Sequence, residues 1–212
     1  MLDAWGERAE VREALQEASD ALGENLGQLI KAGPKEALAL TTNTQPVMLV
    51  AGVAAWRVWR AEGGALPSVL AGHSLGEYAA LVASGVLTLA QAAPLVRFRA
   101  AAMQEAVPVG TGAMAAILGM DAQRVIAGCA EAQATFGAGT VEVVEAVNFN
   151  DPSQTVIAGS KAAVEKACEV LKANGAKRAL PLSVSAPFHS SLMKPAAELL
   201  KEKLASTVFS AS

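Results

Sequence analysis

The order of predicted strands and helices between residues 112 and 185 constrains the fold more than any other feature of this chain. Apolar or alternating segments predict strands, and segments with helical spacing and capping residues lie between them. The expected strands are residues 112–120, 140–149, 154–160 and 176–184, and the expected helices are residues 121–134 and 161–175. The resulting order, βαββαβ, is that of the ferredoxin-like split unit. We therefore predict a small ferredoxin-like domain at residues 112–185.

The flanking sequence predicts a larger α/β domain, into which the small one is inserted. Residues 68–71 form a short apolar run typical of a strand, and a glycine-flanked turn leads from it into a helix that begins at Leu75. Strand, turn and helix are the unit of parallel sheets. Further helices are expected at residues 3–31, from 44–46 to Gly63-Gly64, at 88–107 with Thr88 as the N-cap, and at 190–204. The large domain would comprise residues 1–111 and 186–212.

Composition and charge exclude two classes of partner. The chain has 212 residues, a net charge of −3 and no block of like charges, so it lacks the basic surface that nucleic acid or an anionic membrane requires. Its longest apolar run, residues 46–56, is too short to span a bilayer, and residues 1–11 lack the pattern of a signal peptide. We expect a cytoplasmic protein. Cys129 and Cys168 belong to no metal-binding pattern, and we expect reduced core residues there and no metal.

The strongest chemical motif is GHSLG at residues 72–76, which fits the nucleophile elbow G-x-S-x-G. A serine on a sharp turn between strand and helix requires neighbours without a Cβ, and Gly72 and Gly76 would meet that need. Ser74 is thus a candidate nucleophile. The backbone N–H of Leu75, at the start of the helix, is a candidate donor to an oxyanion. The alternative is an ordinary turn between a strand and a helix.

A serine nucleophile needs a general base, and the chain has two histidines. His73 precedes Ser74, and consecutive side chains in an elbow diverge, so we expect it to pack beneath the turn as a structural residue. His189 lies where the chain leaves the last strand of the small domain and approaches a helix. The sequence therefore favours His189 as the base of Ser74, with a structural role as the alternative.

Five segments of the chain resemble a known family, the malonyl-CoA:acyl-carrier-protein transacylases of fatty-acid synthesis and the related acyltransferase domains of polyketide synthases. The resemblance covers essentially the whole chain. The segments are GHSLGEYAALVASGV, VRFRAAAMQEAVPVGTGAMAAILGM, VNFNDPSQTVIAG, AKRALPLSVSAPFHSSLMKPA and TQPVMLVAGVAAWRVW. It implies an α/β-hydrolase-like large domain with a parallel sheet and an inserted ferredoxin-like domain.

The resemblance implies transfer of a malonyl group from malonyl-CoA to the phosphopantetheine thiol of acyl carrier protein, through an ester on Ser74 and with His189 as base. Arg99 matches the family arginine that holds the malonyl carboxylate, which suits a rigid, permanently charged guanidinium. Arg97, on another helix face, would be a solvated charge. Phe188 resembles an aromatic residue that limits room for branched acyl groups. No cofactor is implied beyond the CoA thioester substrate, and we expect a monomer.

The chain departs from the family pattern at both ends. Family members begin with a strand and a Gly-Gln-Gly-Ser-Gln loop that supplies a second oxyanion donor, and they continue beyond the equivalent of residues 206–212. We therefore expect a chain truncated at both ends. Two other functions stay open: a serine esterase of the α/β-hydrolase type, which shares G-x-S-x-G, and an inactive fragment that binds the carrier protein.

Overall fold

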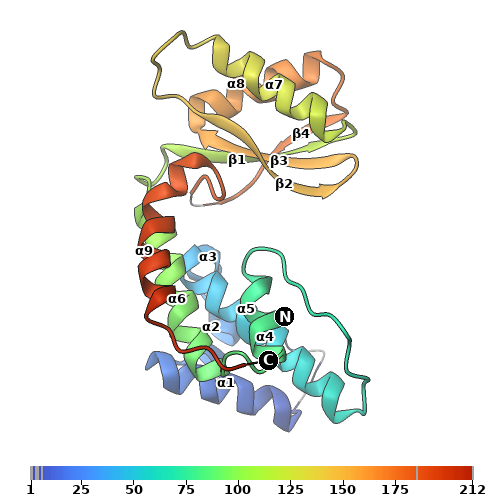
Figure 1. Ribbon diagram of the computed structural model, residues 1–212, viewed down its shortest axis with the longest axis vertical. Helices are drawn as coiled ribbons and strands as arrows, with labels where there is room; N and C mark the ends of the chain where they lie inside the picture. The colour runs from blue at the N-terminus through green and yellow to red at the C-terminus, as the bar shows by residue number, and fades with distance from the viewer. Residues whose placement is uncertain (1, 3–4, 6, 185, 212) are drawn as a thin grey trace. The chain divides into compact units, whose positions relative to one another are not determined.

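The computed structural model describes residues 2, 5, 7–184 and 186–211. The chain divides into two compact units, Met1–Ala101 with Leu200–Ser212, and Ala102–Leu199 (Figure 1). Each unit has a hydrophobic core of its own. The described residues form helices and a β-sheet, so the protein belongs to the mixed α/β class. Ser185, at the predicted end of the small domain, lies outside the described residues.

The secondary-structure elements that the structure describes in the first unit are all helices, joined by turns and irregular segments. They are α1 (Ala9–Leu22), α2 (Leu26–Ala32), α3 (Lys35–Ala39), α4 (Thr41–Ala61), α5 (Gly76–Ala83), most of α6 (Leu89–Glu105) and the end of α9 (Lys194–Ala205). Their core is made of small and branched aliphatic side chains, among them Leu26, Leu49, Val50, Leu87 and Leu89, all nearly inaccessible to solvent. Close packing of these side chains holds the unit together.

The single helix predicted at residues 3–31 is wrong, because the chain breaks at Gly23. Gly23 has a φ of 65°, a left-handed conformation that closes α1 and that favours glycine. Asn25 then caps α2, accepting a hydrogen bond from the Gln28 N–H at 2.8 Å. Two helices, α1 and α2, therefore replace the one long helix that was predicted.

The helix predicted from residues 44–46 begins earlier, at Thr41. Pro46 lies inside α4 rather than at its start. Thr41 and Gln45 are buried, and the Gln45 Nε2 donates to the Thr41 Oγ1 at 2.9 Å. Packing and this side-chain bond thus outweigh the low helix propensity of the Thr-rich first turn.

The strand predicted at residues 68–71 does not form. The segment is irregular and exposed, with Val69 77% accessible. A strand needs a neighbour to bond its N–H and C=O groups, and all strands of the described residues belong to the second unit. Within the described part of the first unit there is accordingly no parallel sheet.

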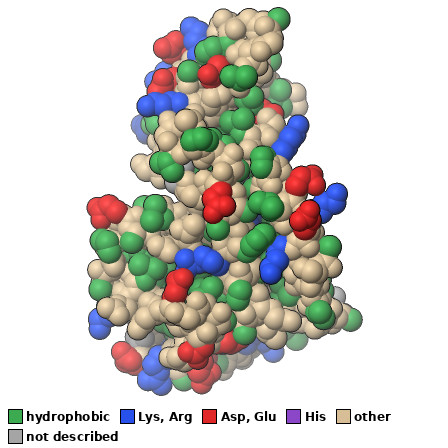
Figure 2. Space-filling model, turned by 90° about the vertical axis from the view of Figure 1, so that its left-hand side faces the viewer, with side chains coloured by type: hydrophobic (Ala, Val, Ile, Leu, Met, Phe, Trp, Pro, Cys, Tyr) green, Lys and Arg blue, Asp and Glu red, His purple; other side chains and the backbone are tan. Residues whose placement is uncertain are grey.

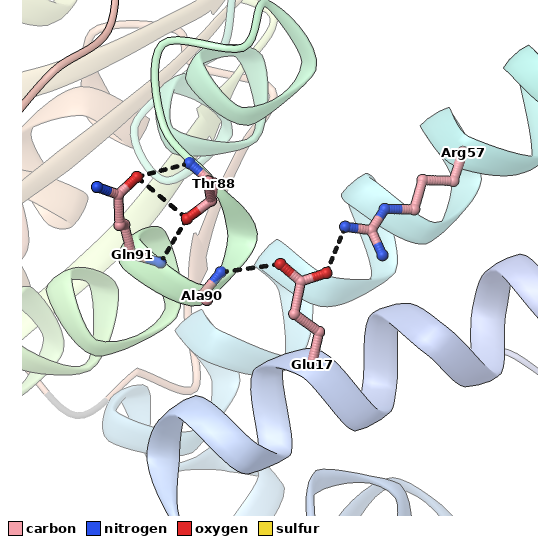
Figure 3. A network of polar contacts seen from close by, with 5 residues as sticks. All are labelled: Glu17, Arg57, Thr88, Ala90 and Gln91. Atoms are coloured by element: carbon pink, nitrogen blue, oxygen red, sulfur yellow. Dashed lines mark hydrogen bonds and ion pairs between the residues drawn. The ribbon is translucent and has the colours of Figure 1, made fainter.

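The N-terminus of α6 confirms Thr88 as its cap. The Thr88 Oγ1 accepts from the Gln91 N–H at 3.1 Å, and the Gln91 Oε1 accepts from the Thr88 N–H at 2.9 Å, which is a reciprocal capping box (Figure 3). Glu17 of α1 extends the network, since its carboxylate accepts from the Ala90 N–H at 3.1 Å and from Arg57 of α4 at 2.6 Å. One carboxylate therefore links α1, α4 and the start of α6.

The second unit contains a four-stranded sheet in the order β2-β3-β1-β4, and every pairing in it is antiparallel. Its elements are β1 (Gly112–Leu118), α7 (Ala122–Ala134), β2 (Val144–Asp151), β3 (Gln154–Ser160), α8 (Lys161–Ala173) and β4 (Arg178–Pro181), followed by the short helix η2 (Ser191–Met193). The predicted order βαββαβ is confirmed. The connection from β1 through α7 to β2 passes over β3, and the connection from β3 through α8 to β4 passes over β1. This is the strand arrangement of the ferredoxin-like split unit.

The two faces of this sheet are covered differently. Ala115, Ile117 and Ile157 point toward α7 and α8 and form one core with them. Met114, Ala116, Val156 and Ala158 alternate with these residues and point to the opposite face, where Phe188 packs. Figure 1 shows α7 and α8 on one side of the sheet and the segment that follows β4 on the other.

Surface charges on the face seen in Figure 2 are of both signs and interspersed, with hydrophobic side chains between them. No helix among the described residues has the length and apolar character needed to cross a bilayer. The same part of the chain contains no group of three or more His, Cys, Asp or Glu side chains placed to hold a metal ion.

Candidate active site

Ser74 lies on a tight turn that leads directly into α5. Its φ is 53°, a left-handed conformation that is uncommon for a residue other than glycine. The Gly76 N–H donates to the His73 carbonyl at 2.9 Å, and the Glu77 N–H donates to the Ser74 carbonyl at 3.2 Å. These bonds close the turn around the serine and hold its side chain at the start of the helix. The elbow geometry thus forms without the strand predicted before it.

The two glycines of the motif differ in their role. A Cβ at Gly72 would lie 1.9 Å from the carbonyl carbon of Gly76, so the backbone passes too close for any side chain. A Cβ at Gly76 would meet nothing within 4 Å. The interpretation that both glycines are required by steric contact is therefore wrong for Gly76.

Arg99 of α6 reaches the candidate nucleophile from a buried position. Its Nη2 donates to the Ser74 Oγ at 2.9 Å, and its Nη1 donates to the Gln45 Oε1. Only 8% of Arg99 is accessible to solvent. The structure therefore brings Ser74 and Arg99 together, across 25 residues of sequence.

Gln45 is a site residue that sequence reasoning did not identify. It is buried, and it passes a chain of hydrogen bonds from Thr41 to the Arg99 guanidinium. It is the last residue of the polar run TTNTQ at 41–45, and nothing in that run distinguishes it from its neighbours. Buried polar groups are retained where they have partners, and here that partner is the arginine.

The charge of Arg99 has no carboxylate partner among the described residues. Its Cζ lies 5.8 Å from the centre of the Tyr78 ring, within range of a cation–π contact. Burial lowers the pKa of Arg99 from its ordinary value, with an opposing effect from Tyr78, and burial likewise raises the pKa of Tyr78. A buried guanidinium is costly unless an anion balances it. The site is consequently suited to a ligand that carries a negative group close to Ser74.

Arg97, two residues away, has a different environment. Its guanidinium pairs with the carboxylate of Glu24 at 2.5 Å and donates to the Asn43 side chain at 3.3 Å. The expectation of a solvated charge is therefore wrong, although the expectation that the two arginines face different neighbours is confirmed. Arg97 stabilises the packing of helices, whereas Arg99 faces the serine.

Leu75 and His73 flank the nucleophile. Leu75 is the N-cap residue of α5, and within the described residues its backbone N–H donates no hydrogen bond. That N–H is free to point at an oxyanion on an acyl group of Ser74. His73 is exposed, so the expectation that it packs beneath the turn is wrong.

His189 and Phe188 belong to the second unit, and Ser74, Leu75 and Arg99 belong to the first. Phe188 is partly buried and packs against the apolar groups around Met114 and Met193. His189 is exposed and has a φ of 67°. Among the described residues other than glycine, Ser74 and His189 are the two with a positive φ. Such strain gathers at functional sites, but the pairing of Ser74 with His189 stays a prediction.

Comparison with known proteins identifies the family. A family model described as acyl transferase domain matches residues 7–212. The malonyl CoA-acyl carrier protein transacylase of Salmonella typhimurium is 53% identical over 201 residues, which are 95% of this chain and 63% of that protein. The transacylase of the same name from Bacillus subtilis is 50% identical over 190 residues, 89% of this chain and 57% of that protein.

Solved structures with similar sequences and folds support the same family. The acyl-carrier-protein S-malonyltransferase of Burkholderia pseudomallei has 62% identity and a TM-score of 0.92, and the alignment covers 99% of this chain and 66% of that one. A malonyl-transacylase solved in complex with a type II polyketide synthase acyl carrier protein has 50% identity and a TM-score of 0.93 over 99% of this chain and 66% of that one. The chain thus spans slightly less than two thirds of the relatives' length. It belongs to the acyl transferase domain family.

Proposed function

We propose that this chain carries the chemistry of malonyl transfer from malonyl-CoA to the phosphopantetheine thiol of acyl carrier protein. The observation that carries the proposal is the buried Arg99, which contacts the Ser74 Oγ and has no carboxylate partner among the described residues. Relatives named malonyl CoA-acyl carrier protein transacylase support the assignment, as does the relative solved with a carrier protein.

The first half-reaction loads the serine. The Ser74 Oγ attacks the thioester carbonyl of malonyl-CoA as its proton passes to His189, and the carbonyl oxygen becomes an oxyanion that the Leu75 N–H stabilises. The intermediate then collapses: the C–S bond breaks, CoA leaves as a thiol with the proton from His189, and malonyl-Ser74 remains. A guanidinium beside the Oγ favours the negative charge that develops there.

The second half-reaction reverses these roles. The thiol of phosphopantetheine gives its proton to His189 and attacks the ester carbonyl, and the C–O bond to Ser74 breaks as the serine regains a proton. Throughout, Arg99 holds the free carboxylate of the malonyl group, which a bidentate guanidinium recognises and an acetyl group lacks. Phe188 limits the room beside the acyl chain. The cycle uses no cofactor, so we expect malonyl transfer to survive exhaustive dialysis against a chelator.

Fold and domain boundaries complete the proposal. We infer an α/β-hydrolase-like large domain with a parallel sheet, at residues 1–111 and 186–212. Residues 112–185 would be the inserted ferredoxin-like domain. We further propose that the protein acts in the cytoplasm as a monomer.

Intact-mass measurement after mixing with malonyl-CoA tests the proposal. We expect one malonyl adduct on the wild-type chain and none on Ser74→Ala. A folded wild-type chain that gains no adduct would contradict malonyl transfer by this chain and favour a carrier-binding fragment. Hydrolysis of aryl esters faster than transfer to a thiol would instead support an esterase.

Substitution of Arg99 by Ala tests the carboxylate role. Loss of a charge-assisted bond to the substrate corresponds to about a hundredfold slower malonyl loading, and acetyl loading should persist or rise. Arg97→Ala is the matched control, since it removes the same charge from the same helix without touching Ser74. Equal loss of malonyl and acetyl loading in Arg99→Ala would refute selectivity by this arginine.

A further inference from the structure

The turn that carries His189 is held in an uncommon backbone conformation. The φ of 67° at His189 lies in the left-handed region, which side chains with a Cβ rarely adopt. On either side of it the backbone is fixed: the Phe188 N–H donates to the Ala186 carbonyl at 3.0 Å, and the buried Ser190 Oγ donates to the Pro187 carbonyl at 2.7 Å. An unfavourable φ persists only where surrounding contacts enforce it.

Glu145 supplies one of those contacts from the sheet. It lies on β2, between Val144 and Ala146, which face the helices, so alternation directs its side chain to the opposite face, where Phe188 packs. Its Oε2 accepts a hydrogen bond from the Ser191 N–H at 2.6 Å, across 46 residues of sequence. A carboxylate on a backbone N–H makes a short and comparatively strong bond.

A second contact fixes the turn before His189. A Cβ at Gly112, the first residue of β1, would lie 2.3 Å from the Pro187 Cδ, so the strand and the proline are in direct contact. Pro187 and Ser191 are thus both tied to the sheet, one by packing and one by the Glu145 carboxylate. His189 lies between these two anchor points.

We propose that Glu145 is a positioning residue for the general base: its carboxylate fixes the Ser191 backbone and thereby holds His189 in the left-handed conformation that directs its imidazole. The inference rests on the proposed function, because it takes His189 as the base. Glu145 itself exchanges no proton with the substrate.

Kinetics of the variants give the first test. Glu145→Ala should lower kcat for malonyl transfer about tenfold to a hundredfold, the range expected for loss of a hydrogen bond to a charged group, with KM for malonyl-CoA unchanged. Glu145→Gln keeps an oxygen acceptor and should recover most of the rate. Glu165→Ala, which removes an exposed carboxylate from α8 of the same unit, should match the wild type.

Solution NMR gives a test that does not depend on turnover. A left-handed residue shows a strong nuclear Overhauser effect between its own amide and α protons. We expect this signal for His189 in the wild type and in Glu145→Gln, and its weakening in Glu145→Ala, where the Ser191 amide should also exchange faster with solvent. These signals report on Glu145 even if the wild-type chain is not malonylated, an outcome that would contradict only the proposed function. Wild-type kcat in Glu145→Ala, or an unchanged His189 signal, would overturn the positioning role.

Discussion

At the scale of single residues, the site is organised by a buried polar chain from Thr41 through Gln45 to Arg99. Sequence reasoning identified Ser74 and the arginine, because their motifs are local or match the family pattern. It missed Gln45, since nothing in a helix sequence shows that a glutamine 54 residues away will face an arginine. Tertiary contacts of this kind are invisible to local patterns.

Replacing Gln45 by Ala should therefore disturb Arg99 without removing it. The guanidinium would lose one of its acceptors in a buried setting, and we expect about tenfold lower kcat/KM for malonyl loading. Loading rates followed by intact mass check this value. Gln28→Ala, a substitution outside the site, serves as the control. Unchanged malonyl loading in Gln45→Ala would show that Arg99 does not depend on Gln45.

Cys129 predicts how stability depends on pH. Burial raises the pKa of its thiol from 9.0 to about 12. Below pH 9 the thiol is protonated in both the folded and the unfolded chain and contributes no pH dependence. Between pH 9 and 12 the unfolded thiol ionises while the folded one resists, so the free energy of unfolding should fall as pH rises.

Urea unfolding between pH 8 and pH 11 measures that slope. We expect Cys129→Ala to flatten it, even though the variant starts from a lower stability because of the cavity. An equal slope in the two proteins would mean that the thiol is ionised to the same extent when folded and unfolded.

At the scale of elements, periodicity and capping residues predict where most helices lie, but backbone conformation and packing determine where they begin and end. The N-cap at Thr88 and the order of elements from β1 to β4 were readable from sequence, because caps and periodicity act within a few residues. The left-handed Gly23 divides a helix that periodicity alone would continue. At residues 68–71 the sequence predicts a strand that does not form, since an apolar run forms a strand only beside a partner strand.

The elbow offers a matched pair of glycine substitutions. Gly72→Ala places a methyl group against the Gly76 backbone and should destabilise the fold by about 1–3 kcal/mol or shift the serine. Gly76→Ala has open space and begins a helix, so it should be neutral or slightly stabilising. Thermal unfolding together with malonyl loading of Ser74 distinguishes them. Equal tolerance of both substitutions would contradict the close backbone approach.

At the scale of the whole molecule, the first unit shows no sheet in its described part, and residues 68–71, where the sequence predicts a strand, are exposed. Val69 is 77% and Leu66 69% accessible. Exposed apolar side chains that lie close together are typical of a surface that contacts another segment or another protein.

Hydrogen exchange tests the state of that segment. In the 212-residue chain we expect the amides of residues 68–71 to exchange as fast as those of an unstructured peptide, because no strand pairs with them in the described structure. The amides of β3, paired on both edges, should be protected. Protection of residues 68–71 equal to that of β3 would show that the strand forms in this chain after all.

Tyr78 offers a way to observe ligand binding at Arg99. It is the chain's one tyrosine, it is buried, and its ring lies over Arg99 beside the serine. A protein grown with fluorotyrosine would thus carry a single fluorine label at the site. Its resonance should move when a carboxylate binds the guanidinium, so occupancy could be followed in solution without any assay of turnover.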